Sequence, residues 1–239
     1  MGANVVLREK SEIEAAYNEL KTKGLPFPDD INKCWDESKA FDFITGHGSK
    51  DDSVLDVGTF KCRLLELLYE KRYRKLYGCD LAPVEWRRRI YPYLFSLRLG
   101  DLLRSLMSMP PIRLSEQNLE HTAYPSGSFD FITSLSVIEH GIGLENYFKE
   151  TSRLLRNGGY LINSADYWPD KVDTEGAGLF GLKWNIFDRN EIEEMIRLAG
   201  KFSFTLTEPI DFTYKSPAIE LKDKRYTFIF FVLQKKKIR

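Results

Sequence analysis

Segments with strand and helix patterns alternate in this chain from residue 53 to about residue 200. Short runs of apolar, β-branched and aromatic residues are each followed by a stretch with apolar residues at helical spacing. This alternation is typical of parallel strands that form a sheet with helices on both faces. We therefore expect a Rossmann-like, doubly wound α/β fold with a mostly parallel, seven-stranded sheet.

The alternation gives expected bounds for each element. Strands are predicted at residues 53–57, 75–80, 97–101, 129–135 and 160–164, and two further β-rich runs at 202–207 and 226–233 predict an antiparallel hairpin at one edge. Helices are predicted at residues 11–22, 35–44, 63–73, 84–95, 103–109, 144–155 and 190–199. Because two helices precede the first strand, we expect residues 1–50 to be a helical extension packed on one globular unit, residues 51–239.

Charge and cysteine content narrow the class of protein. The chain has 35 basic and 35 acidic side chains, and this balance argues against a dedicated nucleic-acid binder. Cys34, Cys62 and Cys79 are far apart and form no C-x-x-C pair, so we expect reduced thiols in a cytoplasmic protein and no metal site. No stretch approaches the ~20 apolar residues that span a bilayer. The sequence gives no indication of the oligomeric state.

Two acidic residues and a glycine stand at the ends of the first two predicted strands. Asp56 and Gly58 close the first strand, where a glycine lets the backbone approach a ligand and the next helix adds a positive partial charge. Asp80 ends the second strand, and an acid there can accept both hydroxyls of a ribose. The sequence thus predicts a nucleoside site, and the alternative is that both acids only terminate strands in turns.

The glycine pattern separates two kinds of nucleoside cofactor. A dinucleotide motif G-x-G-x-x-G would need glycines at the positions of Phe60 and Arg63, and no phosphate-binding G-K-S or G-K-T sequence occurs. A site without a pyrophosphate cradle favours S-adenosylmethionine over NAD. An NAD-dependent oxidoreductase remains as an alternative class.

Five segments together resemble class I S-adenosylmethionine-dependent methyltransferases. They are residues 54–58, 77–81, 125–132, 136–140 and 153–159. The combination is similar to the small-molecule branch of this family, which includes the ubiquinone-biosynthesis methyltransferases. The resemblance covers residues 53–164 well and the rest of the chain only by the order of elements.

The resemblance implies a set of cofactor contacts. Gly58 would let the backbone pass the methionine part of S-adenosylmethionine, Asp56 would orient that loop or the amino group, and Asp80 would bind the ribose. The other implied cofactor residues are Leu81, Asn118 at the adenine amine, Leu119 beside the ring, and Leu135 and Ser136 near the methionine part. The family has glycines at the positions of Phe60 and Cys62, so a changed loop path, weaker affinity or lost cofactor binding stays open.

The methyl acceptor is less constrained by the sequence. His140 follows the fourth strand of the alternating region and is the candidate general base, while Trp168 and Trp184 suit a flat, hydroxylated acceptor; each can also have a packing role. We expect O-methylation of a small molecule or glycan, with S-adenosylhomocysteine as the product. The alternatives are N-methylation of a protein or RNA acceptor, and a binding module that keeps the fold without turnover.

Overall fold

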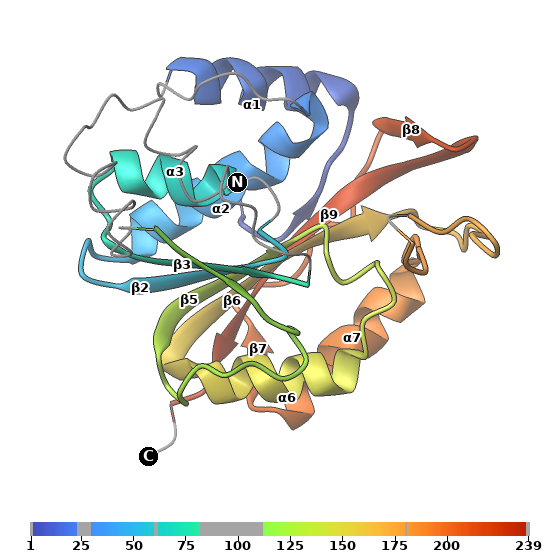
Figure 1. Cartoon of the computed structure of the whole chain (residues 1–239). Coiled ribbons are helices and arrows are strands. Elements are labelled where there is room, and N and C mark those ends of the chain that lie inside the picture. Colours follow the sequence, from blue (N-terminus) through green and yellow to red (C-terminus); the bar gives the residue numbers. More distant parts are fainter. Residues whose placement is uncertain (1, 23–29, 60–61, 82–111, 180, 238–239) are drawn as a thin grey trace.

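The structure is a computed structural model that describes residues 2–22, 30–59, 62–81, 112–179 and 181–237 (Figure 1). The predicted helices 84–95 and 103–109 and the predicted strand 97–101 lie outside these residues. Every other predicted element has a counterpart, and three strands and two helices begin and end within one residue of their expected bounds.

The described residues contain a nine-stranded sheet in the order β1-β9-β6-β5-β2-β3-β4, with β7 and β8 also paired to β9. The strands are β1 (Val5–Val6), β2 (Ser53–Val57), β3 (Lys75–Asp80), β4 (Ile112–Glu116), β5 (Phe129–Leu135), β6 (Leu155–Tyr167), β7 (Phe204–Leu206), β8 (Ile219–Leu221) and β9 (Lys224–Lys235). The fold class is confirmed, but the sheet has nine strands rather than seven. The sequence analysis did not predict β1, β4 or β8.

The chain order of the strands reverses in the middle of the sheet. From β2 the chain moves outward through β3 and β4, and it then returns to place β5 on the other side of β2. These strands and β6 are parallel, so their carboxyl ends share one edge. Ligands of open α/β folds bind where the order reverses, outside the carboxyl ends of the strands. The expected site is therefore near the ends of β2 and β5.

Helices cover both faces of the sheet (Figure 1). One face packs against α1 (Lys10–Thr22), α2 (Cys34–His47) and α3 (Arg63–Glu70), and the other against α6 (Leu144–Leu154) and α7 (Arg189–Lys201). Alternate residues of each central strand face opposite layers: Val54 packs with the first group of helices and Leu55 with the second. The antiparallel β7–β9 and β8–β9 pairs complete the sheet at the end of the chain.

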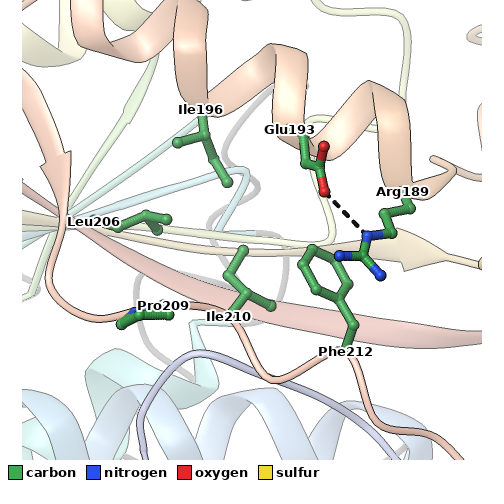
Figure 2. A pocket seen from close by; sticks show the side chains of 7 residues that line it. All are labelled: Arg189, Glu193, Ile196, Leu206, Pro209, Ile210 and Phe212. Carbon is green, nitrogen blue, oxygen red and sulfur yellow. Dashed lines mark hydrogen bonds and ion pairs between the residues drawn. The ribbon is translucent and has the colours of Figure 1, made fainter.

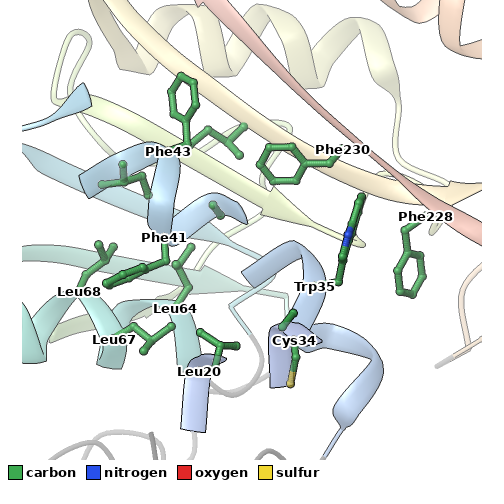
Figure 3. Packing of buried hydrophobic residues seen from close by; sticks show 14 of the residues in the cluster. Leu20, Cys34, Trp35, Phe41, Phe43, Leu64, Leu67, Leu68, Phe228 and Phe230 are labelled. Atoms are coloured by element: carbon green, nitrogen blue, oxygen red, sulfur yellow. The ribbon is translucent and has the colours of Figure 1, made fainter. Parts of the chain in front are cut away.

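The N-terminal helices pack tightly on the first face. Figure 3 shows Trp35 of α2 next to Phe228 and Phe230 of β9, and the rings of Trp35 and Phe230 are perpendicular with centroids 6.3 Å apart. Residues Val5 and Val6 also join the sheet as β1, antiparallel to β9. These contacts bring α2 to the carboxyl edge of the sheet. The division of the chain at residue 50 stays a prediction.

None of the helices in the described ranges combines the length and the apolarity that a membrane crossing requires.

Candidate active site

Asp56 lies on β2, between β3 and β5, where the chain order of the strands reverses. It is opposite Gly78 of β3 and Thr133 of β5, and its Oδ1 accepts a 2.6 Å hydrogen bond from the Thr133 hydroxyl. Burial raises the pKa of the Asp56 carboxyl to about 6, although the Thr133 hydrogen bond acts in the opposite direction. At neutral pH the residue is an ionised acceptor held in one orientation.

Gly58 is the residue at which the loop after β2 requires a glycine. Its φ is +67°, and a Cβ built there would lie 2.5 Å from Cγ2 of Val137. Its backbone N–H donates to the carbonyl oxygen of Cys79, which ties the loop to β3. A side chain is thus excluded where the family passes its backbone along the methionine part of the cofactor.

Cys62 takes a glycine-like backbone conformation without being a glycine. Its φ is +59°, in the left-handed region, directly before α3. Because the family has glycine at this position, the chain keeps the expected conformation despite the substitution. A non-glycine residue pays about 1–2 kcal/mol for that conformation. Phe60, the other substituted position, lies outside the described residues.

Asp80 ends β3 at the same edge of the sheet. It pairs in register with Glu116 of β4, and its carbonyl oxygen accepts a hydrogen bond from the Gln117 N–H. Leu81 follows Asp80 and is 57% exposed. Asp80 lies one strand from Asp56, where the sequence analysis placed the ribose contact.

Asn118 and Leu119 stand in the turn that follows β4. Asn118 is exposed, and its side-chain oxygen accepts a 2.9 Å hydrogen bond from the Glu120 N–H. Leu119 is buried in the apolar cluster that also holds Val57 and Val137. Their predicted roles at the adenine stay predictions.

The turn after β5 joins the sheet to α2. The N–H of Ser136 donates to the carbonyl oxygen and hydroxyl of Ser164 on β6, both at 3.0 Å, while its φ of +53° turns the chain sharply. The Ser164 hydroxyl donates to Asp36 at 2.7 Å, and the Ser136 hydroxyl does so at 3.4 Å. Leu135, half-buried, precedes this turn. Asp36, fully buried on α2, therefore lies over the ends of β5 and β6.

A second acid of α2 reaches the loop after β2. Glu37 forms a 2.9 Å ion pair with Arg63, the first residue of α3. Burial raises the pKa of Glu37 to about 8, and the Arg63 charge offsets only part of that effect. Arg63 also donates to the carbonyl oxygen of Asp30 and to Sγ of Cys34. The first turn of α2 is thus fastened to the segment where the resemblance places the methionine part.

A buried charged cluster, formed by Lys33, Asp36, Glu139 and Asp166, lies at the ends of β5 and β6. The Lys33 Nζ is 4.0 Å from Asp36, and its charge also acts on Glu139 and Asp166. Burial lowers the pKa of Lys33, but the surrounding carboxylates outweigh it and raise that pKa. Burial raises the pKa of all three acids: that of Asp166 to about 6 and that of Glu139 far above its usual value.

Aromatic side chains form the wall of this cluster. The indole nitrogen of Trp184 donates a 2.7 Å hydrogen bond to Asp166, and the Trp184 ring lies edge-on to Tyr226 with centroids 5.8 Å apart. The hydroxyl of Tyr226 also acts on Asp166 and lowers the pKa of that carboxyl, against the larger effect of burial. Burial, followed by the Lys33 charge, lowers the pKa of His140, so its imidazole is neutral at physiological pH.

The structure brings together some of the predicted site residues and separates others. Asp56, Gly58 and Asp80 share one edge, and His140 and Trp184 both lie by the buried charged cluster. Trp168 instead packs against Tyr214, with ring centroids 5.2 Å apart. The sequence analysis missed Lys33, Asp36 and Tyr226. Lys33 and Asp36 lie three residues apart in the chain and Tyr226 comes from the distant strand β9, and no local pattern marks them as neighbours of Glu139 and Asp166.

One pocket of the described residues, about 310 Å³ in volume, lies between α7 and the segment after β7 (Figure 2). Its lining is mostly apolar, and its two charged residues, Arg189 and Glu193, form a 3.0 Å ion pair with each other. It contains no residue of the predicted site. Its chemistry does not suit a nucleoside or a reacting group.

Comparison with known proteins agrees with this geometry. Residues 55–163, which run from β2 to β6 and include Asp56, Gly58, Asp80 and Glu139, match the family model of the methyltransferase domain. These residues are a class I methyltransferase domain. The predicted enzyme class is confirmed, and the cofactor of this class is S-adenosylmethionine. No curated protein matches the sequence.

Solved methyltransferases share the fold of this domain at low sequence identity. A S-adenosylmethionine-dependent methyltransferase of Methanosarcina mazei has 15% identity and a TM-score of 0.57, covering 82% of this chain and 98% of that chain. Geranyl diphosphate C-methyltransferase of Streptomyces coelicolor A3(2), solved with Mg²⁺, geranyl diphosphate and S-adenosylhomocysteine, has 13% identity and a TM-score of 0.59, covering 89% and 87%. A methyltransferase of Mesorhizobium loti has 12% identity and a TM-score of 0.54, covering 83% and 97%.

Proposed function

We propose that this protein transfers a methyl group from S-adenosylmethionine to a small molecule. The observation that carries the proposal is the placement of two distinct sites side by side: the Asp56–Gly58–Asp80 edge and the buried charged cluster, joined by Ser136. One site has the residues of a nucleoside contact and the other has groups that can hold a polar acceptor. Some structural neighbours act on small molecules, such as geranyl diphosphate. This supports a substrate of the same class for this protein.

The residues at this edge fit the cofactor. Gly58 leaves no room for a Cβ, and we assign Asp56 to the cofactor's amino group and Asp80 to the ribose hydroxyls, because both stand near the carboxyl ends of neighbouring strands. We assign Leu81, Asn118, Leu119, Leu135 and Ser136 to the rest of this contact. When bound, the cofactor supplies a methyl group on a sulfonium. The protein orients the acceptor against it and excludes water.

Two kinds of acceptor atom are consistent with the second site. The neutral imidazole of His140 favours a hydroxyl acceptor, because it can take the proton that O-methylation releases. The carboxyl groups of Glu139 and Asp166 favour a nitrogen acceptor, which is argued further below. A flat, hydroxylated small molecule or glycan beside Trp184 remains the candidate for oxygen.

Binding of the product cofactor tests the function directly. A ligand that binds only the folded protein raises the melting temperature according to RT ln(1 + [L]/Kd). We expect S-adenosylhomocysteine to raise it and NAD to leave it unchanged. No shift at millimolar S-adenosylhomocysteine would indicate a binding module that has lost its cofactor, and a shift with NAD alone would indicate an oxidoreductase.

We also propose a location in the cytoplasm. The three cysteines are all buried and free of disulfides, which is usual for proteins of a reducing compartment. Fractionation of cells that express the chain at natural levels would test this, and recovery in a secreted fraction would contradict it.

A further inference from the structure

The buried charged cluster has an excess of acid. The carboxyl groups of Asp36, Glu139 and Asp166 come together from α2, the turn after β5 and β6, and the facing cation in the described part of the chain is Lys33. If all three carboxyl groups were ionised, one ammonium group would leave two of them without a countercharge. A buried charge is costly unless it is paired, so this arrangement is complete only with a further positive group or with bound protons.

Glu139 is the member of the cluster with an unsatisfied carboxyl oxygen. Its side chain is 1% exposed, and its Oε2 has no hydrogen-bond partner among the described residues. By contrast, Asp36 accepts from Ser164, and Asp166 accepts from Trp184. Buried polar atoms are normally satisfied, so an unpartnered carboxyl oxygen marks the position of a missing donor.

Lys33 shows how a cation is held there. Its Nζ lies 4.0 Å from Asp36 and 4.8 Å from the centre of the Phe228 ring, an arrangement that attracts cations to aromatic faces. The Tyr226 ring makes edge contacts with both Phe228 and Trp184, at interplanar angles of 68° and 69°, and continues this wall toward Asp166. The Lys33 side chain is 30% exposed, so the cluster reaches the surface at this residue.

We propose that the methyl acceptor is a small aliphatic amine, whose ammonium group binds between Glu139 and Asp166 against the rings of Trp184 and Tyr226. The inference rests on the proposed methyltransferase function and names the substrate class of that site. The amine supplies the donor that Glu139 lacks and the positive charge that the three acids need. Glu139 Oε2 is also placed to take the proton that leaves the ammonium nitrogen, which frees the nitrogen lone pair for methylation.

Matched ligands test charge recognition without changing shape. N,N-dimethylethanolamine is a cation at neutral pH, and isoamyl alcohol has the same shape with a carbon in place of the nitrogen. Both are titrated calorimetrically into the full-length protein, with and without S-adenosylhomocysteine. We expect the amine to bind at least ~10-fold more tightly than the alcohol, a difference of about 1.4 kcal/mol.

Two variants move this affinity in opposite directions. Glu139→Gln, which keeps the shape, is expected to weaken amine binding at least ~10-fold, because it removes the unpaired carboxylate. Lys33→Met is expected to strengthen it, because it removes the resident cation. If the two residues had only structural roles, one substitution would not weaken amine binding while the other strengthens it. Glu220→Gln, at an exposed position on β8, is the matched control and should bind as the wild type does.

The outcomes separate the two proposals. Failure of S-adenosylhomocysteine to bind overturns the methyltransferase function, and the titration without it still tests the amine site. If S-adenosylhomocysteine binds but the alcohol binds as well as the amine, if neither binds, or if Glu139→Gln has no effect, the amine proposal is wrong and the methyltransferase function stands.

Discussion

At the scale of single residues, position 58 requires a glycine because of a side-chain contact as well as its positive φ. A Cβ there would overlap Cγ2 of Val137 at 2.5 Å, in addition to the strain of its positive φ. We expect Gly58→Ala to lower the free energy of unfolding by about 2 kcal/mol or more and to weaken S-adenosylhomocysteine binding.

A second substitution isolates the overlap. Val137→Ala removes both methyl groups that would clash, so Gly58→Ala/Val137→Ala should lose about 1 kcal/mol less than the sum of the single losses. Urea unfolding of the four proteins measures this coupling. Additive losses would show that backbone strain alone requires the glycine.

Asp56 links cofactor binding to pH. Burial raises its pKa to about 6, so the carboxylate that would receive the cofactor's amino group is protonated below that pH. We expect the affinity for S-adenosylhomocysteine to fall up to ~10-fold per pH unit below about pH 6 and to be level above it. Asp56→Asn should bind weakly at every pH. Calorimetric titration from pH 5 to 8 compares the affinities of the two proteins for S-adenosylhomocysteine. A wild-type affinity that does not change with pH would contradict this role of Asp56.

Strand-end acids and glycines could be found from the sequence because strand ends are local features. Asp56 and Asp80 terminate apolar runs, and the topology then requires their side chains to meet at one edge. The conformation of Cys62 could not be found in this way, since the absence of glycine suggested a changed loop. Its left-handed φ depends on the start of α3 and on surrounding packing.

At the scale of elements, a buried ion pair joins α2 to α3 in addition to their apolar packing. Glu37 and Arg63 have side-chain exposures of 12% and 9%, and the loss of one partner leaves the other charge buried. We expect Arg63→Met to lower the free energy of unfolding by ~3–5 kcal/mol above about pH 8, where Glu37 is ionised, and by less at lower pH. Glu37→Leu/Arg63→Met should recover much of that loss. A double-mutant cycle in urea tests the pair, and no recovery would mean that Arg63 acts through Asp30 and Cys34 instead.

Local signals predicted most elements well, and long-range pairing explains the errors. The helix predicted at residues 190–199 has such a local signal, since Asp188 and Glu191 form a capping box at the start of α7. In contrast, β1 has only two residues and exists through its pairing with β9, more than two hundred residues away. The strand β4 lies at the sheet edge and is half-exposed, so its apolar pattern is weak.

At the scale of the whole molecule, several buried acids make stability depend on pH. Burial raises the pKa of Glu37 and Glu66 to about 8 and those of Asp56 and Asp166 to about 6. A raised pKa means that the folded state holds the proton more tightly than the unfolded state, in which these acids titrate near pH 4. Their contribution is present below about pH 4 and is lost as the pH rises to about 8.

We therefore expect the free energy of unfolding of the ligand-free protein to fall as the pH rises from about 5 to 8. Glu150 acts at the acid end: burial opposes its ionisation, but hydrogen bonds from Arg153 and Thr122 lower its pKa to about 2, so its contribution is lost as the pH falls. Glu66→Gln should flatten the decline and stabilise the protein at pH 8 by about 1 kcal/mol or more, whereas Glu220→Gln should not. Urea unfolding across this pH range measures the free energy of unfolding, and a rise of that free energy toward pH 8 would contradict the expectation.

The central claim is that the carboxyl ends of β2 and β3 form the cofactor site, and Asp80 tests it most directly. Glu116 pairs with Asp80 in register on β4 and is the matched control. If Asp80 accepts hydrogen bonds from both ribose hydroxyls, Asp80→Ala should weaken S-adenosylhomocysteine binding by ~30-fold or more, while Glu116→Gln changes it less than about twofold. Calorimetric titration of the three proteins gives the answer. Equal affinity of Asp80→Ala and the wild type would contradict the account.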